Sequence, residues 1–185
     1  MIEYQNLSEY SQPPSLRGRS KFIVQMWWIF QATLFRWSPR ALFGWRNLLL
    51  RLFGAKIGSN VRIRSSVNIT YPWKLEIGNS CWVGDDCFLY NLDHIKIGNN
   101  VALAHGVYIS TGEHDYTKKT FDIKLRPVVI EEQAWLANDV FIAPGVTIGK
   151  GAVIGARSTV LKDMPEGMVC VGYPAKPLKP RIDKK

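Results

Sequence analysis

Residues 130–159 read IEEQAWLANDVFIAPGVTIGKGAVIGARST, and this stretch decides the fold. From Ile130 to Ile154 an aliphatic residue stands at every sixth position, and a small residue follows most of these positions. A period of six matches neither the 3.6-residue period of a helix nor the alternation of a single strand. It is typical of a β-solenoid, in which each hexapeptide forms one short strand and one corner. Three such strands per coil predict a triangular prism filled by aliphatic ladders.

A looser form of the repeat begins closer to the N-terminus. Ile-Gly followed by Ser or Asn recurs at Ile57, Ile77 and Ile97, twenty residues apart, so these coils carry two more residues at a corner. Gly at such corners adopts backbone angles that most side chains resist. We therefore expect the solenoid to occupy residues 56–165.

The repeat is interrupted once, at residues 110–129. A loop inserted into a regular solenoid usually lies on one face, often the binding face. This loop begins Ser110-Thr-Gly-Glu-His-Asp-Tyr and holds His114, one of three histidines. A histidine can accept a proton at neutral pH, and Glu113 and Asp115 flank it, where they could orient the ring or contact substrate. The loop is therefore the candidate site for acid–base chemistry.

Residues 1–55 predict a polar arm followed by an aromatic-rich helical segment. Ser38-Pro39 is typical of an N-cap and a first helical residue, for a helix that stops at Gly54. The apolar run before it is shorter than the twenty residues needed to span a bilayer. Two interpretations remain open. Either the helices pack over the open end of the prism, or residues 20–53 make peripheral contact with a membrane through Trp, Phe and Arg side chains.

The C-terminal residues 166–185 predict a short strand and an extended basic tail. Pro174, Pro177 and Pro180 oppose regular hydrogen bonding in this segment. Lys and Arg residues lie among the prolines, so the tail is a candidate partner for phosphate groups.

The net charge of +9 is unevenly distributed. Residues 57–161 hold ten basic and ten acidic residues, whereas residues 1–56 carry +6 and residues 162–185 carry +3. A neutral prism argues against a nucleic-acid interface, while basic ends suit anionic ligands or lipid. Three cysteines without a CxxC pattern predict neither a disulfide framework nor a metal site, and Cys81 and Cys87 are expected to be core thiols. We find no signal-peptide pattern and expect a cytoplasmic protein.

Several stretches taken together resemble a known family. The loop TGEHD (111–115), the run AWLANDVFIAPGVTIGKGAVIGARSTVLKDMP (134–165) and the tail VGYPAKPLKP (171–180) resemble the hexapeptide-repeat acyltransferases, in the branch of galactoside, nodulation and maltose O-acetyltransferases. RGRSKFIVQMWWIFQATLFR (17–36) and ITYPWKLEIG (69–78) resemble more narrowly the colanic acid biosynthesis acetyltransferases. The resemblance implies an all-β, left-handed parallel β-helix, and a homotrimer with active sites in clefts between copies. It also implies acetyl-CoA as the co-substrate and no metal.

The resemblance assigns roles to residues at matching positions. His114 matches the general base, and Asn91 and Trp135 match residues that contact the acceptor. Asn138 stands where the family has a serine near the thioester, which leaves a role for its backbone N–H and removes one for a hydroxyl. The positions expected to contact CoA are Ala137, Asn138, Ala143, Lys162, Lys176 and Lys179.

These observations predict an O-acetyltransferase that modifies a sugar during exopolysaccharide assembly of the colanic acid kind. We expect direct transfer with His114 as base, because no cysteine or serine is paired with a base as a nucleophile would need. The expected acceptor is a sugar or a lipid-linked oligosaccharide, and the sequence leaves open whether the acceptor is linked to a nucleotide or to a lipid at the inner face of the plasma membrane. Three alternatives stay open: an N-acetyltransferase acting on an amino sugar, an inactive membrane-docked scaffold, and a γ-class carbonic anhydrase. The spacing of His94, His105 and His114 fits the last of these poorly.

Overall fold

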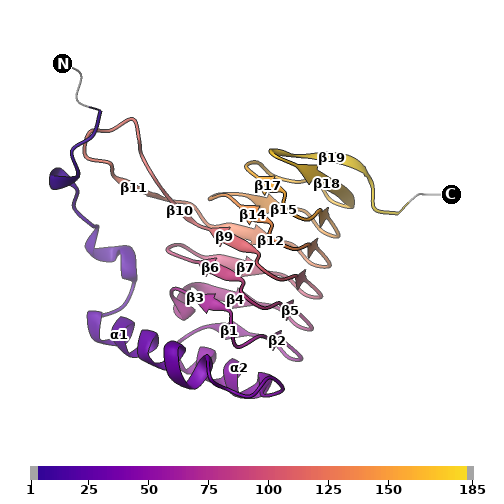
Figure 1. Cartoon of the computed structure of the whole chain (residues 1–185), viewed down its shortest axis with the longest axis horizontal. Helices are drawn as coiled ribbons and strands as arrows, with labels where there is room; N and C mark the ends of the chain where they lie inside the picture. The colour runs from indigo at the N-terminus through magenta and orange to yellow at the C-terminus, as the bar shows by residue number, and fades with distance from the viewer. Residues whose placement is uncertain (1–3, 183–185) are drawn as a thin grey trace.

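The computed structural model describes residues 4–182, and a prism of parallel strands forms its body (Figure 1). Each coil contributes one strand to each of three sheets, and the strands of successive coils pair in parallel and in register. This confirms the parallel solenoid that the six-residue period predicts. The first three residues of the expected arm and the last three of the expected tail lie outside the described residues.

The three sheets are named A, B and C in the order in which the chain visits them. Sheet A contains β1 (Lys56–Ile57), β4 (Leu75–Ile77), β7 (Ile95–Ile97), β12 (Val128–Ile130) and β15 (Thr147–Ile148). Sheet B contains β2 (Arg62–Ile63), β5 (Trp82–Val83), β8 (Ala102–Leu103), β13 (Trp135–Leu136), β16 (Val153–Ile154), β18 (Met168–Gly172) and β19 (Ala175–Pro180). Sheet C contains β3 (Asn68–Ile69), β6 (Phe88–Tyr90), β9 (Tyr108–Ser110), β14 (Phe141–Ile142) and β17 (Thr159–Val160).

Stacked aliphatic side chains fill the interior of the prism, and each contributes about 1.5–3 kcal/mol through burial. Cys81 and Cys87 lie among them as buried free thiols, as expected. Burial raises the pKa of the Cys87 thiol to about 12, which makes it a poor nucleophile at neutral pH. The ladder of sheet B runs through Ile63, Val83, Leu103, Leu136 and Ile154, each at most 2% exposed.

The corner between sheets B and C turns through a residue in the left-handed region. This residue is Asp86, Gly106, Asp139 or Arg157 in successive coils, with φ between 58° and 70°. Asn138 directly precedes Asp139 and so lies in this corner. The corner between sheets C and A is where the chain leaves the prism to form the inserted loop.

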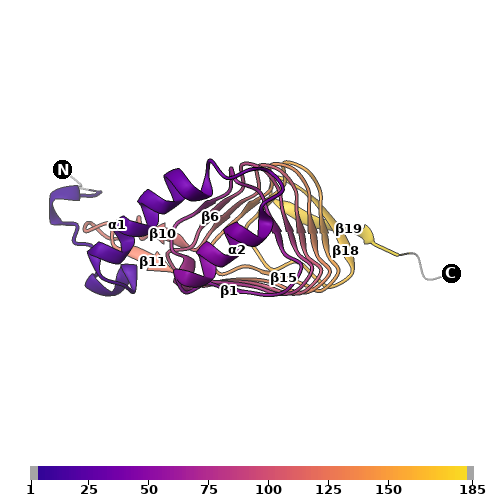
Figure 2. The ribbon, with the colours of Figure 1, turned by 90° about the horizontal axis from the view of Figure 1, so that it is seen from below.

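Helices close the N-terminal end of the prism. The 3₁₀ turns η1 (Leu7–Glu9) and η2 (Pro14–Arg17) lead into α1 (Lys21–Phe30), a π-helical turn η3 (Gln31–Phe35) and α2 (Phe43–Leu52). Figure 2 shows α1 and α2 lying across the open end of the coils. A further 3₁₀ turn, η4 (Pro72–Lys74), lies between sheets C and A.

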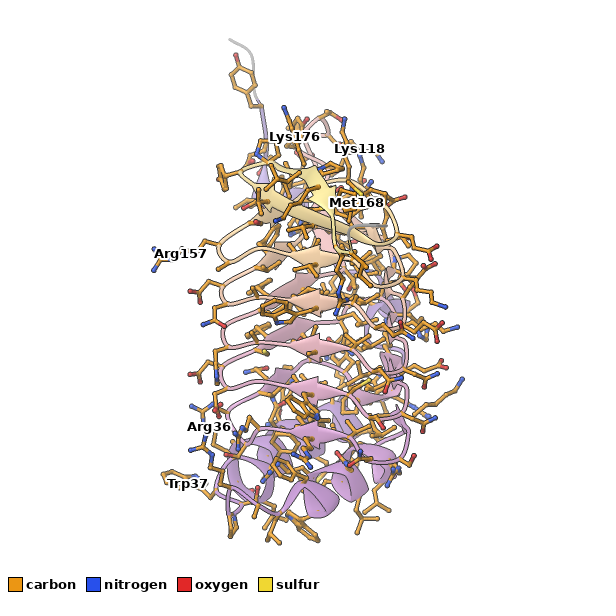
Figure 3. All side chains as sticks on the ribbon, turned by 90° about the vertical axis from the view of Figure 1, so that its right-hand side faces the viewer. Arg36, Trp37, Lys118, Arg157, Met168 and Lys176 are labelled. Carbon is orange, nitrogen blue, oxygen red and sulfur yellow. The ribbon has the colours of Figure 1, made fainter. Side chains whose placement is uncertain are left out.

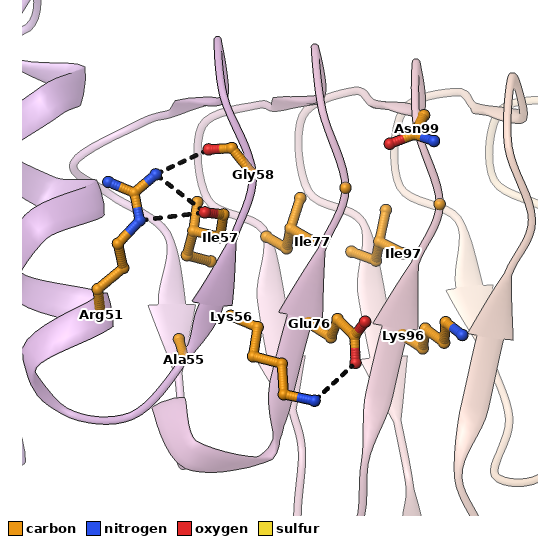
Figure 4. Close-up of a pocket in the computed structure, with 12 residues that line it drawn as sticks. Arg51, Ala55, Lys56, Ile57, Gly58, Glu76, Ile77, Lys96, Ile97 and Asn99 are labelled. Carbon is orange, nitrogen blue, oxygen red and sulfur yellow. Dashed lines mark hydrogen bonds and ion pairs between the residues drawn. The ribbon is translucent and has the colours of Figure 1, made fainter.

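The helices supply hydrogen bonds that a preceding coil would otherwise provide. In the second coil, carbonyls such as those of Cys81 and Val83 accept N–H groups from the first coil. The equivalent carbonyls of the first coil have no coil beneath them. Side chains of the helices donate to these carbonyls instead, over 2.7–3.0 Å: Arg51 to Ile57, Asn47 to Val61, Arg46 to Ile63 and Trp27 to Ile69. Figure 4 shows the bonds of Arg51.

Arg46 is the centre of this cap and is fully buried. Besides the Ile63 carbonyl it donates to the Ser38 hydroxyl and to the carbonyls of Pro39 and Arg40, over 2.7–2.9 Å. Loss of solvation lowers the pKa of its guanidinium, and the ring of Phe43 lies 5.1 Å from its charge. The interpretation of the helices as a cap is thereby confirmed.

Two local expectations for this segment are wrong. Ser38 is no N-cap, because its hydroxyl donates to the Phe35 carbonyl at 2.6 Å and accepts from Arg46, while α2 begins later, after Leu42. Trp27, one of the aromatics that the membrane interpretation assigned to lipid, is buried in the core. The expected stop near Gly54 is correct, since α2 ends at Leu52 and Gly54 has φ of 95°.

The C-terminal tail is more regular than its prolines suggest. β18 adds a parallel strand to sheet B, and β19 returns antiparallel against it at the edge of the sheet. Proline is tolerated in an edge strand, where its missing N–H can face away from the partner. The expectation of an extended tail without regular structure is therefore wrong for residues 175–180.

Replacement of Arg46 by methionine should destabilise the protein by roughly 3 kcal/mol, because the buried Ile63 carbonyl and the acceptors at Ser38 and Pro39 would lose their donor. Urea denaturation measures this loss. Arg36→Met is the matched control, since Arg36 is exposed and makes a single bond to the Ser66 carbonyl, and its cost should stay within about 0.5 kcal/mol. Equal stability of the two variants would contradict the role given to Arg46.

Candidate functional site

The inserted loop forms a hairpin that projects from the corner between sheets C and A (Figure 1, left). Its strands β10 (Gly112–His114) and β11 (Ile123–Leu125) pair antiparallel, with His114 opposite Ile123. Thr111 anchors the base of the hairpin. It is fully buried, donates its hydroxyl to the Tyr90 carbonyl at 3.0 Å and accepts the Asp93 N–H at 2.8 Å. The hairpin is thus an ordered extension of the rigid prism.

His114 lies on this hairpin with one ring nitrogen engaged. Its Nδ1 is 2.7 Å from the carbonyl oxygen of Phe121. A carbonyl oxygen only accepts, so Nδ1 carries the proton and Nε2 of the neutral ring keeps its lone pair. The ring stacks on Phe121, with centroids 4.3 Å apart and planes 7° from parallel, and the edge of Tyr10 meets it at 5.6 Å. The arrangement holds an exposed proton acceptor in a fixed orientation.

The two flanking carboxylates do not orient the histidine. Glu113 forms an ion pair with Arg126. Asp115 is buried and accepts from the Thr117 hydroxyl at 2.5 Å and from Lys124 at 3.1 Å, and these contacts lower the pKa of its carboxyl to about 2. The expectation that either carboxylate orients the ring is wrong, because the Phe121 carbonyl does so. The position of Asp115 also leaves little of its surface for a substrate.

The N-terminal arm is fastened to the same hairpin. The Asn6 N–H donates to the Lys119 carbonyl at 2.8 Å, and Glu9 pairs with the Lys119 ammonium at 2.9 Å. Tyr10 follows directly and makes the contact with His114. Residues separated by more than one hundred positions therefore build the surroundings of His114.

A groove of about 460 Å³ runs along the outer face of sheet B. Trp135 and Asn138 lie at one end of it, and Arg62 of the first coil lies at the other. The Ala137 N–H donates to the Ile154 carbonyl and is unavailable to a ligand. The Asn138 N–H has no partner within residues 4–182. It is thus the one N–H of this pair that can stabilise an oxyanion.

The remaining residues assigned to CoA lie in two places. Lys162, Lys176 and Lys179 are exposed toward the C-terminal end, and none of the three forms an ion pair with a described residue. Ala143 lies instead at the corner between sheets C and A, one coil beyond the hairpin, and its N–H donates to the Val160 carbonyl. Sheet C therefore separates Ala143 from Ala137.

Asn91 does not fit the role of a sugar-contacting residue. It is fully buried, its Oδ1 accepts the Tyr71 N–H at 2.9 Å and its Nδ2 donates to the Tyr71 carbonyl at 2.6 Å. Both amide groups thus satisfy the backbone of the preceding coil, so we assign Asn91 to the core.

A single chain does not bring His114 and the groove together. In Figure 1 the hairpin projects on one side of the prism, whereas β2, β5 and β18 of sheet B lie on the other, and Figure 2 shows the same separation of β10 and β11 from β18. Chemistry that uses His114 together with Asn138 therefore needs a second copy of the chain.

Sequence reasoning missed several residues of these two regions. Trp82, Arg64 and His105 line the groove with Trp135. One signal was available: Trp82 stands at the same place in its hexapeptide as Trp135, directly before an inward aliphatic residue. No local signal pointed to Tyr10 or Phe121.

Two kinds of site are not found in the described part of the chain. Residues 4–182 contain no cluster of three or more side chains of the metal-ligating types. Within the same residues, every helix is too short or too polar to cross a membrane.

Comparison with known proteins gives consistent matches. Residues 127–162 match the family model for the bacterial transferase hexapeptide (six repeats). The chain is 53% identical over 179 residues to WcaF of Escherichia coli (strain K12), named as a colanic acid biosynthesis acetyltransferase, and the match covers 97% of this chain and 98% of that protein. It is 31% identical over 142 residues to the galactoside O-acetyltransferase of the same organism, covering 75% and 70%. A maltose O-acetyltransferase structure from Clostridium difficile matches with a TM-score of 0.79 at 28% identity, covering 90% of this chain and 95% of that one.

Proposed function

The chain belongs to the hexapeptide-repeat acetyltransferases, and from that premise we propose that it transfers an acetyl group from acetyl-CoA to a sugar hydroxyl with His114 as the general base. The observation that carries this proposal is the hydrogen bond from His114 Nδ1 to the Phe121 carbonyl. It fixes the neutral tautomer in which Nε2 can accept a proton. Positioned proton transfer of this kind accelerates reactions by roughly 10² to 10⁴-fold.

The steps follow from the chemistry of these groups. Nε2 of His114 removes the proton of the acceptor hydroxyl as its oxygen attacks the thioester carbonyl. The oxyanion of the tetrahedral intermediate accepts the Asn138 N–H of a neighbouring copy. The C–S bond then breaks, and the imidazolium returns its proton to the departing thiolate. The buried thiols of Cys81, Cys87 and Cys170 favour this direct route over a cysteine-linked intermediate.

Acetyl-CoA is proposed to run along sheet B toward the C-terminal end. Its phosphates would meet Lys162, Lys176 and Lys179, whose ammonium groups are exposed. Figure 3 shows Lys176 at the end of the prism farthest from Trp37 and the helical cap. The thioester then lies near Asn138, with Trp135 beside it in the groove.

A homotrimer is proposed because the faces of the prism differ. Sheet A points charged side chains such as Lys56, Glu76 and Lys96 outward (Figure 4). Sheet C carries a half-buried aromatic ladder, in which Phe88 and Tyr108 stack at 5.0 Å. Closed rings of copies are the usual way to cover such a face. Contact between sheet C of one copy and sheet B of the next would bring a hairpin to each groove.

The acceptor is proposed to be a sugar of an exopolysaccharide. WcaF, which is named for colanic acid biosynthesis, matches nearly the whole chain. The relative named galactoside O-acetyltransferase favours a hydroxyl over an amine as the nucleophile. N-acetylation of an amino sugar is the alternative that a panel of acceptors would reveal.

The outward side of the helical cap is proposed to rest on a membrane surface. Leu34, Trp37, Leu42 and Trp45 line a shallow apolar hollow there, and Trp37 is 83% exposed. Arg36 lies next to Trp37 at this end (Figure 3). Aromatic side chains with adjacent arginines are typical of interfacial contact with anionic lipid.

His114→Gln should lower kcat by roughly 10² to 10⁴-fold, since the base is removed, while leaving the affinity for acetyl-CoA unchanged. Steady-state kinetics with a sugar panel and calorimetric titration with acetyl-CoA measure the two quantities. His94→Gln is the control and should keep full activity, because the exposed His94 side chain belongs to the preceding coil and has no role in the proposed steps. Undiminished turnover in His114→Gln would refute the assignment.

Mixed trimers test whether two copies build each site. His114→Gln and Lys176→Glu/Lys179→Glu should each be nearly inactive alone. Random mixing on co-expression should restore about a quarter of the wild-type sites in the whole preparation and about a third in isolated mixed trimers, because each mixed ring pairs one intact hairpin with one intact groove. Isolation of the doubly tagged species and assay of its activity give the answer. Mixed species as inactive as their parents would argue for sites within single copies.

Leu34→Ser/Trp37→Ser should reduce partition to anionic phospholipid vesicles about tenfold or more, because it removes two apolar side chains of this hollow, including the highly exposed Trp37. Co-sedimentation measures the partition. Tyr116→Ser removes a comparably exposed aromatic from the hairpin and should change nothing. Unaltered sedimentation of the cap variant would remove the basis for membrane contact.

A further inference from the structure

The groove of sheet B extends well beyond the residues that acetyl transfer requires. It crosses four strands, β2, β5, β8 and β13, which is about 14 Å at the usual strand spacing. Trp82 and Trp135 stand on its floor, 56% and 47% exposed, with Ala102 between them in register. Flat indole surfaces separated by a small residue are suited to stacking against the apolar face of a sugar ring.

The end of the groove at the helical cap is strongly cationic. Arg62 and Arg64 line it, and Arg40 lies nearby. Asp85 is the carboxylate that Arg64 and Arg40 face, at 3.6 and 4.0 Å, and it also accepts the Ser66 hydroxyl at 2.9 Å. Two guanidinium groups thus share one carboxylate, and Arg62 stands beside them without one.

Arg62 is the most available of these cations. It is exposed and forms no ion pair with any residue between 4 and 182, and its guanidinium lies 5.5 Å over the Trp82 ring. An arginine held over an aromatic ring keeps its donors free for an anion. Arg64 lies 5.8 Å over Phe43 of α2, which fixes it at the same end of the groove.

His105 adds a neutral donor to this set. Its Nδ1 accepts the Asp85 N–H at 3.1 Å, so Nε2 carries the proton of the neutral ring. The side chain is exposed and lines the groove together with the two tryptophans. Together these residues offer fork-shaped cationic donors beside an aromatic platform, the arrangement that recognises phosphate next to a sugar.

We propose that this end of the groove binds the diphosphate of a glycosyl diphosphate, so that the acceptor is an activated or carrier-linked sugar rather than a free one. The inference rests on the proposed function, because acetyl-CoA then occupies the opposite direction, from Asn138 toward the C-terminal lysines. The sugar ring lies on the indoles of Trp82 and Trp135, with its hydroxyl near Asn138. The diphosphate receives donors from Arg62 and Arg64.

Two kinds of molecule carry this chemistry: a nucleotide sugar and a sugar linked through diphosphate to a lipid. Both present the same anion to the arginines. They differ in the group beyond the diphosphate, which would leave the groove past Phe43 at the helical cap. Assays with both kinds of acceptor separate the two sources.

The test uses the full-length protein and hexoses offered in three forms: methyl glycoside, nucleoside diphosphate sugar and farnesyl diphosphate sugar. For whichever hexose is acetylated, wild-type kcat/KM should be higher for a diphosphate form than for the methyl glycoside. Arg62→Gln/Arg64→Gln should lower kcat/KM about 10 to 100-fold for the diphosphate forms, through loss of charge-assisted hydrogen bonds. Activity on the methyl glycoside and affinity for acetyl-CoA should be unchanged.

Matched variants keep the result interpretable. Lys56→Gln/Lys96→Gln removes the same charge from sheet A and should alter none of these values. Arg62→Gln alone, which breaks no ion pair, should give part of the loss if the double variant is less stable. Inorganic pyrophosphate should compete with the diphosphate acceptor on the wild type and bind the double variant at least tenfold more weakly by calorimetry.

The outcomes separate this inference from the proposed function. Equal efficiency on methyl glycosides and diphosphates, or equal pyrophosphate binding by wild type and variant, would overturn the diphosphate site and leave acetyl transfer standing. Failure of the wild type to bind acetyl-CoA would overturn the proposed function itself. Preference for the nucleotide form would assign the acceptor to the sugar-nucleotide pool, and preference for the farnesyl form to a lipid carrier.

Discussion

The structure depends on hydrogen bonds that complete the open end of a parallel solenoid. Backbone N–H groups of each coil donate to carbonyls of the next, so the carbonyls of the first coil have no preceding coil to supply a donor. A buried unpaired carbonyl costs about 1–3 kcal/mol, and several occur together at such an end. The helical segment meets this demand with Arg46, Asn47, Arg51 and Trp27, whose side chains take the places of backbone N–H groups. The cap is therefore part of the hydrogen-bonding scheme of the prism as well as a hydrophobic cover.

The three faces of the rigid prism differ in the side chains that they expose, and each is suited to a different kind of contact. Sheet A is charged and suited to solvent, sheet C is aromatic and suited to a neighbour, and sheet B carries the groove. His114 lies on a hairpin at one corner, and the backbone N–H of Asn138 lies at another. Because coils cannot bend to bring these corners together, the geometry favours a site completed between copies.

The sequence predicted the features that follow from the six-residue repeat, but it did not predict contacts between particular residues of different coils. The six-residue period reports local alternation of buried and exposed positions, so it identified the solenoid, its core cysteines and the site of the insertion. It carried no information on pairs formed across coils. The amide of Asn91 bonds to Tyr71, twenty residues earlier, and this contact turns an expected ligand of the sugar into a core residue. The ring of His114 is likewise held by the Phe121 carbonyl. Every residue has a backbone carbonyl, so residue types alone cannot identify this acceptor.

The cap and the coil-by-coil pairing together bear on the order in which the chain can fold during synthesis. Each coil pairs with the one made about twenty residues before it, and the helices that template the first coil precede it on the chain. A nascent chain can thus extend the prism from a finished end, one turn at a time, without exposing a long unpaired edge. The N-terminal arm is the exception, because the contacts of Asn6 and Glu9 with Lys119 can form only after Lys119 has been synthesised. The surroundings of His114 are therefore assembled late, when much of the prism has already formed.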